Sequence, residues 1–163
     1  MTATDDLLRN NQTYADGFDQ GDLPMPPAAK LAVVACMDAR LDVYRLLGLE
    51  LGEAHVIRNA GGVVTDDALR SLVISQRLLG TREIVLVHHT DCGMLTFRDD
   101  AVKDEITADV GVRPRFALEA FPDPDEDVRQ SIARLRDCPF LPHKDEIRGF
   151  VYQVESGQLR EVR

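Results

Sequence analysis

Short apolar runs that alternate with helical patterns constrain the fold of this chain more than any other feature. Strand-like patterns cover residues 30–36, 54–62, 83–89, 149–154 and 157–162. Helical periodicity covers residues 42–49, 65–80 and 122–138. The run at 83–89 contains four consecutive apolar residues, three of them β-branched, which indicates burial on both faces of a sheet. The alternation predicts an α/β fold with a mostly parallel central β-sheet flanked by helices.

Capping residues mark the ends of the two longer helices. Thr65 suits the N-cap of the helix at 65–80, and Gly80 is expected just past its end. Asp123 suits the N-cap of the helix at 122–138, with Pro124 at the first helical position. These residues predict where both helices begin and where the first one stops.

The first 29 residues look peripheral and have no core of their own. One short helix within residues 5–18 and a Pro-rich extended stretch after it are expected. Such a segment either stays loose or lies on another surface, such as that of a partner subunit. We therefore predict an N-terminal arm at 1–29 and one domain at 30–163, in keeping with a chain of 163 residues.

The charge of the chain excludes several classes of partner. Nineteen basic residues against 28 acidic ones give a net charge of −9, so binding to nucleic acid or to anionic membrane surfaces is not expected. No apolar stretch approaches the roughly 18 residues of a membrane span. The acidic N-terminus does not resemble a secretory signal. Three cysteines give no disulfide framework, so we expect a cytoplasmic protein with reactive, metal-binding or buried thiols.

Potential metal ligands stand where predicted strands end. His89 and Cys92 form a His-x-x-Cys pair after the strand at 83–89, and Cys36 ends the strand at 30–36. If these strands are neighbours, the three side chains meet at one edge of the sheet, where sites of α/β proteins gather. Two thiolates and an imidazole suit Zn²⁺, and three protein ligands leave an open position typical of a catalytic site. The alternative is two small core cysteines and a histidine with ordinary hydrogen bonds.

Two further residues of similar chemistry are judged differently. His88 is a rival ligand, but strand alternation directs it to the opposite side from His89. It is either a packed strand-end imidazole or a proton shuttle. Cys138 lies at a predicted helix end without other ligands nearby, which indicates a structural role.

Three motifs together resemble the β-class carbonic anhydrases. They are Cys36-Met37-Asp38-Ala39-Arg40, Arg58-Asn59-Ala60-Gly61 and His89-Thr90-Asp91-Cys92. Their order and separations also fit that family, and the resemblance covers roughly residues 25–155. It implies a zinc-dependent lyase that hydrates carbon dioxide reversibly to bicarbonate and a proton, by attack of zinc-bound hydroxide.

The resemblance also assigns roles to individual residues. One Zn²⁺ per chain is held by Cys36, His89 and Cys92, and Asp38 with Arg40 forms the catalytic dyad. The substrate pocket involves Asn59, Ala60, Gly61 and Gly93. The family shows Asp38 either paired with the arginine or turned to the metal, so a pH-dependent switch between these states is one hypothesis. The implied assembly is a homodimer or homotetramer in which the arm packs on the partner.

The chain departs from the family pattern at a few positions that bear on the substrate. Gly62 stands where the family often has Asn, and Met94 stands where Gly or Ala is common. The chain also lacks Trp, which some members use in an inhibitory bicarbonate pocket. These differences keep two alternatives open. One is a carbonyl sulfide or carbon disulfide hydrolase on the same zinc scaffold, and the other is a non-catalytic zinc-binding module.

Overall fold

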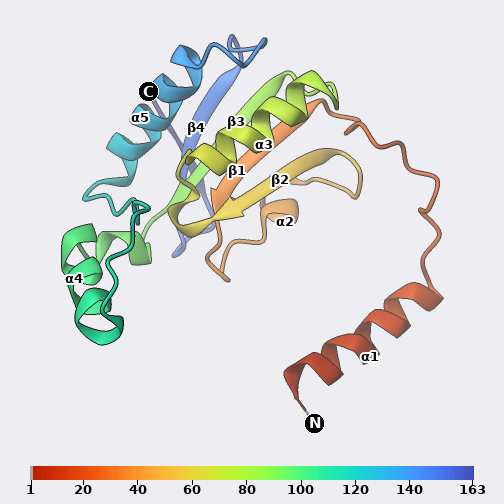
Figure 1. Cartoon of the computed structure of the whole chain (residues 1–163). Helices are drawn as coiled ribbons and strands as arrows, with labels where there is room; N and C mark the ends of the chain where they lie inside the picture. Colours follow the sequence, from red (N-terminus) through yellow and green to blue (C-terminus); the bar gives the residue numbers. More distant parts are fainter. Residues whose placement is uncertain (1) are drawn as a thin grey trace.

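A five-stranded sheet forms the centre of the computed structural model, which describes residues 2–163 (Figure 1). The strands are β1 Leu31–Cys36, β2 Ala54–Asn59, β3 Glu83–His89, β4 Ile147–Tyr152 and β5 Leu159–Val162. Their order is β2-β1-β3-β4-β5; the first four run parallel, and β5 pairs antiparallel with β4. The predicted α/β class and mostly parallel sheet are confirmed, and β1 and β3 are direct neighbours.

The helices are α1 Ala3–Asp16, α2 Val43–Leu47, α3 Asp66–Arg77, α4 Asp99–Val110 and α5 Pro124–Asp137. Of these, α2, α3 and α5 lie on the faces of the sheet. Two short 3-10 turns, Ala60–Gly62 and Gly93–Leu95, follow β2 and β3. Helices α3 and α5 lie on one face, where Leu72 and Leu135 meet alternate residues of β1 and β3. On the other face α2 and the loops cover a second cluster around Val33, Val87 and Phe121.

Most predicted boundaries hold, and the exceptions have local causes. Thr65 and Asp123 cap α3 and α5 through side-chain hydrogen bonds, as predicted. Helix α3 nevertheless ends at Arg77 with Leu78 as its C-cap, so Gly80, with φ +76°, lies past the expected position. Strand β4 begins two residues before the expected 149 because Ile147 already pairs with Ile84 of β3.

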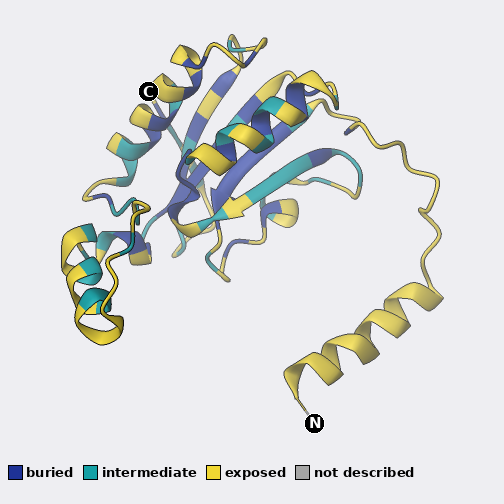
Figure 2. Ribbon diagram, in the orientation of Figure 1, coloured by how far each residue is buried: buried dark blue, intermediate teal, exposed yellow. Residues whose placement is uncertain are grey.

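Helix α1 stands apart from the rest of the chain (Figures 1 and 2). Thr2 and Asp5 form a capping box that starts the helix earlier than the sequence pattern suggested. No residue of α1 is buried, and Leu7, Tyr14 and Phe18 are exposed. None of the helices within residues 2–163 has the length and apolar character needed to cross a membrane.

Candidate metal centre

Three potential ligands gather at the carboxyl ends of two neighbouring strands. Cys36 is the last residue of β1 and His89 the last of β3, while Cys92 follows the turn after β3. The three side chains are buried, and their ligand atoms all lie within 4.8 Å of one another. Because β1 and β3 are paired, the sheet itself brings these side chains together.

The hydrogen bond of His89 leaves one ring nitrogen available. Its Nδ1 lies 2.7 Å from the carbonyl oxygen of Thr90, an acceptor that fixes the proton on Nδ1. The Nε2 atom is buried and has no hydrogen-bond partner in the described part of the chain. A buried nitrogen lone pair beside two thiols is the arrangement that a ligating histidine needs.

The two thiols share one hydrogen bond and therefore differ in acidity. The hydrogen bond from Cys92 lowers the pKa of Cys36 well below its usual range, whereas the Cys36 sulfur raises the pKa of Cys92. Burial opposes the charged form of His89, yet the contact with Cys36 raises its pKa. The site thus stabilises a thiolate in a buried place, which is the electrostatic setting of a soft cation site.

Asp38 and Arg40 form a close ion pair next to these ligands. Nε and Nη2 of Arg40 donate to the Asp38 carboxylate at 3.0 and 2.8 Å, and the Arg40 backbone N–H donates to it at 2.8 Å. These bonds hold the pKa of Asp38 well below its usual range. Oδ2 of Asp38 lies 3.7 Å from Nε2 of His89, so the ionised carboxylate borders the ligand group.

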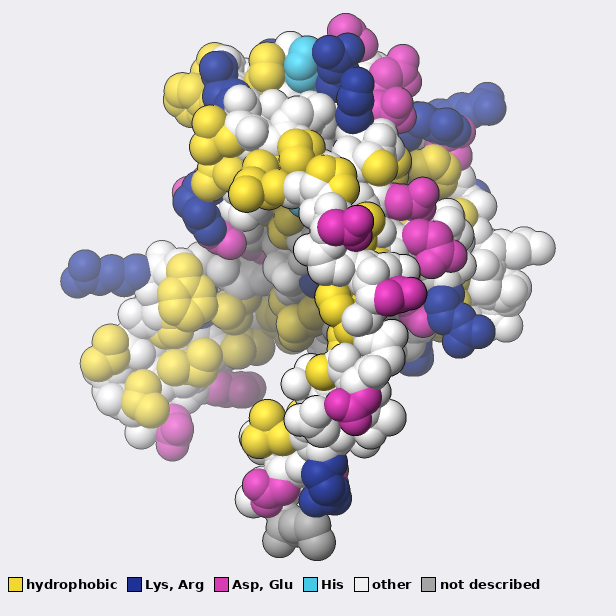
Figure 3. Space-filling model, turned by 90° about the vertical axis from the view of Figure 1, so that its right-hand side faces the viewer, with side chains coloured by type: hydrophobic (Ala, Val, Ile, Leu, Met, Phe, Trp, Pro, Cys, Tyr) yellow, Lys and Arg dark blue, Asp and Glu magenta, His cyan; other side chains and the backbone are white. Residues whose placement is uncertain are grey.

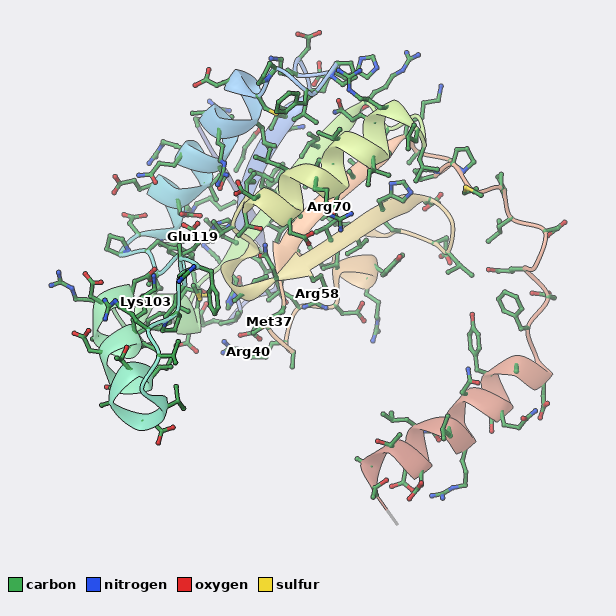
Figure 4. All side chains as sticks on the ribbon, viewed as in Figure 1. Met37, Arg40, Arg58, Arg70, Lys103 and Glu119 are labelled. Carbon is green, nitrogen blue, oxygen red and sulfur yellow. The ribbon has the colours of Figure 1, made fainter. Side chains whose placement is uncertain are left out.

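Two residues that the sequence interpretation gave no role also contact this turn. Arg58 donates from Nε and Nη2 to the carbonyl oxygen of Cys36 at 3.0 and 2.9 Å, and from Nη2 to that of Asp38 at 2.7 Å. Asp91 accepts hydrogen bonds from Arg40. Figure 4 shows Met37, Arg40 and Arg58 together at the ends of β1 and β2. The membership of both residues in the quoted motifs was the available signal.

The residues predicted to line the pocket occupy the turns after β2 and β3. Asn59 donates from Nδ2 to the carbonyl oxygen of Val63 at 2.8 Å, and its Oδ1 is buried without a hydrogen-bond partner in the described residues. Ala60 is exposed, whereas Gly61 is buried with φ +82°. A Cβ on Gly61 would lie 2.9 Å from Phe121, but one on Gly93 would meet nothing within 4 Å. Gly93 therefore leaves open space beside the ligand turn.

Gly62 packs directly against the strand that carries Cys36. Its φ is +71°, and a Cβ there would lie 2.8 Å from the Cys36 backbone nitrogen and 3.1 Å from the Val87 carbonyl oxygen. Neither neighbour is a flexible side chain. Glycine at this position thus allows the turn after β2 to contact β1 and β3 closely.

His88 and Cys138 lie away from the ligand group. His88 is fully buried, and its Nε2 lies 2.6 Å from Oδ2 of Asp127 on α5. Its ring also lies against Phe121, with ring centroids 5.3 Å apart. This is the packed arrangement, on the side opposite His89 as strand alternation predicted. Cys138 is buried in the core beneath α3 and α5, as expected of a structural residue.

Comparisons with known proteins identify the family. The carbonic anhydrase family profile matches residues 31–113. The chain is 62% identical over 162 residues to β-carbonic anhydrase 1 of Mycobacterium tuberculosis, covering 99% of both chains. A carbon disulfide hydrolase of an Acidianus species is 35% identical over 182 residues, with 96% of this chain and 87% of that protein covered.

A solved structure agrees with these sequence comparisons. The carbonic anhydrase of Streptococcus mutans superimposes with a TM-score of 0.93 at 44% identity, covering 100% of this chain and 99% of that one. The motifs quoted from the sequence, the fold and the group of potential ligands are therefore all consistent with membership of one family. The chain belongs to the β-carbonic anhydrase family.

Proposed function

We propose that this carbonic anhydrase hydrates carbon dioxide reversibly to bicarbonate and a proton with one Zn²⁺ per chain, held by Cys36, His89 and Cys92. The carrying observation is the convergence of three buried donors within 4.8 Å at paired strand ends. The unpartnered Nε2 of His89 and the two adjacent buried thiols fit a soft divalent cation. When bound, zinc supplies Lewis-acid activation of a water molecule near neutral pH.

Asp38 and Arg40 are the proposed catalytic dyad. Arg40 keeps Asp38 ionised, so the carboxylate acts as a hydrogen-bond acceptor beside the ligand group. A water molecule whose O–H donates a hydrogen bond to Asp38 would have its lone pair directed elsewhere, which orients it for attack on a small linear substrate. Arg58 supports this geometry by holding the carbonyl groups of Cys36 and Asp38.

The remaining pocket residues act through space and backbone placement. We assign Asn59, Ala60, Gly61 and Gly93 to the substrate pocket because of where they lie. The first three are at the end of β2, beside the strand that carries Cys36, and Gly93 directly follows Cys92. The absence of a side chain at Gly93 leaves room for a three-atom molecule next to Cys92. Substrate and product are then small and linear or planar, namely carbon dioxide and bicarbonate.

A second substrate class has a specific observation in its favour. Proteins named carbon disulfide hydrolases are 33–37% identical to this chain. Carbon disulfide and carbonyl sulfide are linear like carbon dioxide, so one activated water serves all three. The identity to β-carbonic anhydrase 1 is far higher, which favours carbon dioxide.

The N-terminal segment supports an oligomer. We propose that residues 1–29 form an arm on a partner subunit of a homodimer or homotetramer and that residues 30–163 form the catalytic domain. Within the arm, α1 has no buried residue and exposes Leu7 and Tyr14, whereas Ala28 and Ala29 are hydrogen-bonded to residues 52 and 53. Figure 3 shows hydrophobic side chains gathered on the side of the molecule that carries α1. Three free cysteines support a cytoplasmic location.

The test is a stopped-flow assay of carbon dioxide hydration with zinc content measured on the same sample. The expected result is one zinc per chain and rapid hydration. Sulfide release from carbonyl sulfide and carbon disulfide is measured in parallel. If either is turned over faster than carbon dioxide, that molecule becomes the proposed substrate. One zinc per chain without turnover of any of the three would instead support a non-catalytic zinc module.

A further inference from the structure

Arg40 is held by two acidic residues rather than one. Asp38 takes the Nε and Nη2 edge of the guanidinium. On the other side, Nη1 donates to Oδ2 of Asp91 at 2.8 Å, and Nη2 donates to the Asp91 backbone carbonyl oxygen at 2.9 Å. A guanidinium has five N–H groups in a fixed fork, so these contacts use different protons. Asp91 therefore complements Asp38 and does not compete with it.

The backbone at Asp91 is unusual. Its φ is +53°, a left-handed conformation that few residues other than glycine adopt, although Asp and Asn tolerate it best. The residue lies in the turn between the proposed ligands His89 and Cys92. Here the turn presents both a carboxylate and a carbonyl to the same arginine. Strained backbone of this kind persists where the surroundings require it, often at functional sites.

We propose that Asp91 is a positioning residue for the reaction, which fixes Arg40 so that Arg40 holds Asp38 away from the metal position. This inference rests on the proposed roles of Asp38 and Arg40. It links the turn that carries two ligands with the turn that carries the dyad, at a contact 51 residues apart in sequence. Without the Asp91 carboxylate, Arg40 loses the acceptor of its Nη1 group and keeps only the Asp91 backbone carbonyl on that side, so Asp38 is free more often to turn toward the ligand group.

Exposure sets the expected size of the effect. The side chains of Arg40 and Asp91 are 48% and 73% exposed, and an isolated pair of this kind contributes little. The effect therefore comes from orientation, and a decrease of about two- to fivefold in kcat/KM is expected. If the Arg40–Asp91 contact were a surface ion pair without a role in the reaction, its loss would leave kcat/KM unchanged.

Three substitutions separate the parts of this contact. Asp91→Asn keeps the left-handed turn and one side-chain oxygen, Asp91→Gly keeps the turn and its carbonyl, and Asp91→Ala strains the turn as well. We expect kcat/KM to fall in the order wild type, Asp91→Asn, Asp91→Gly and Asp91→Ala, with the lowest value for Asp91→Ala. Asp67→Asn is the matched control, because Asp67 pairs with Arg70 at 2.9 Å on an exposed helix surface.

A second readout does not depend on turnover. Thiocyanate binding to cobalt-loaded protein, followed by visible absorption, reports access to the fourth metal position. If Asp38 blocks that position more often in Asp91→Ala, the apparent Kd for thiocyanate rises by the same factor by which kcat/KM falls. Loss of a negative charge alone would strengthen anion binding, so weaker binding distinguishes the proposal from a simple charge effect.

The Asp38→Ala background completes the test. There the Asp91→Ala substitution should no longer weaken thiocyanate binding, because the blocking carboxylate is gone. Unchanged kcat/KM and unchanged or tighter thiocyanate binding in all three Asp91 variants would overturn the inference. If Asp38→Ala itself retained wild-type hydration, the proposed Asp38–Arg40 dyad would be wrong. That result can be told apart from an error in the role of Asp91, which the Asp91 variants test.

Discussion

At the scale of single residues, the candidate site depends on polar side chains that are fixed by hydrogen bonds through one atom and present another atom to a ligand or substrate. The Nδ1 of His89 is committed to the Thr90 carbonyl, so Nε2 faces the thiols. Arg40 commits Asp38 to the ionised form, and Arg58 fixes the carbonyl groups on either side of Met37. Each of these hydrogen bonds fixes the orientation of a group before a ligand or substrate binds, so binding does not have to restrict that group.

The close contact at Gly62 gives a prediction for stability. Gly62→Ala should lower the free energy of unfolding by about 3 kcal/mol, because positive φ and backbone overlap both oppose a Cβ. Gly111→Ala is the control: it also has positive φ, +75°, but its Cβ would meet nothing within 4 Å, so about 1 kcal/mol is expected. Urea unfolding measures both. Equal losses in the two variants would show that the Gly62 turn can move away from β1.

Residue identities at the site were largely predictable from sequence, because the motifs specify ligand chemistry at strand ends. Cys36, His89 and Cys92 meet as the strand pattern implied. The contacts of Asp91 and Arg58 were not predictable. They depend on a left-handed backbone at Asp91 and on β2 lying beside β1, and neither follows from residue type alone.

At the scale of elements, helix α4 shows what periodicity cannot detect. No residue of α4 is buried, and its N-cap, Arg98, makes no side-chain capping bond. Its place is set instead by Asp99, whose carboxylate accepts the backbone N–H groups of Leu118, Glu119 and Ala120. The helix therefore lacked an apolar stripe for the sequence to reveal, whereas α3 and α5 were predicted from their stripes and caps.

Asp99 accordingly gives a prediction about pH. Burial raises its pKa, but the three backbone hydrogen bonds outweigh this and the net pKa is lowered. The folded state then binds the proton less readily than the unfolded state, so this stabilisation is complete above the ordinary carboxyl range and is lost as pH falls through the folded pKa.

Asp99→Ala should therefore lower the free energy of unfolding by about 2 kcal/mol at pH 7, with the difference shrinking below about pH 4. Urea unfolding at several pH values measures this, and amide exchange at residues 118–120 should accelerate. Asp100→Ala is the control, since its carboxylate is 89% exposed and pairs with Arg113 at the surface. A loss that did not depend on pH would argue against the role of the ionised carboxylate.

At the scale of the whole molecule, the sheet with its helices and the N-terminal helix α1 present different surfaces. The sheet is covered by helices and loops, whereas α1 exposes Leu7 and Tyr14, and Phe18 just after the helix is exposed as well. Exposed apolar side chains on a helix without a partner in its own chain favour association. An arm that covers a partner subunit stays a prediction, since the lack of a core in residues 1–29 does not specify which surface they would cover.

The arm prediction concerns assembly. Replacing both Leu7 and Tyr14 by Glu should shift the protein toward monomer, because two charges would enter the apolar contact. Light scattering coupled to size-exclusion chromatography measures the mass. Gln12→Glu with Thr13→Glu adds the same charge away from the apolar side of α1 and should leave the mass unchanged. A double Glu variant at Leu7 and Tyr14 with wild-type mass would contradict a role of the arm in assembly.

The central claim joins the metal ligands to the dyad, and the Asp38→Ala variant tests it most directly. Carbon dioxide hydration and zinc content are measured on wild type and variant under the same conditions. We predict one zinc per chain in both proteins and a loss of at least about 100-fold in kcat/KM in the variant, the size of effect seen when a preorganised hydrogen-bonding group is removed from a reaction site. Wild-type hydration by zinc-loaded Asp38→Ala would contradict the account.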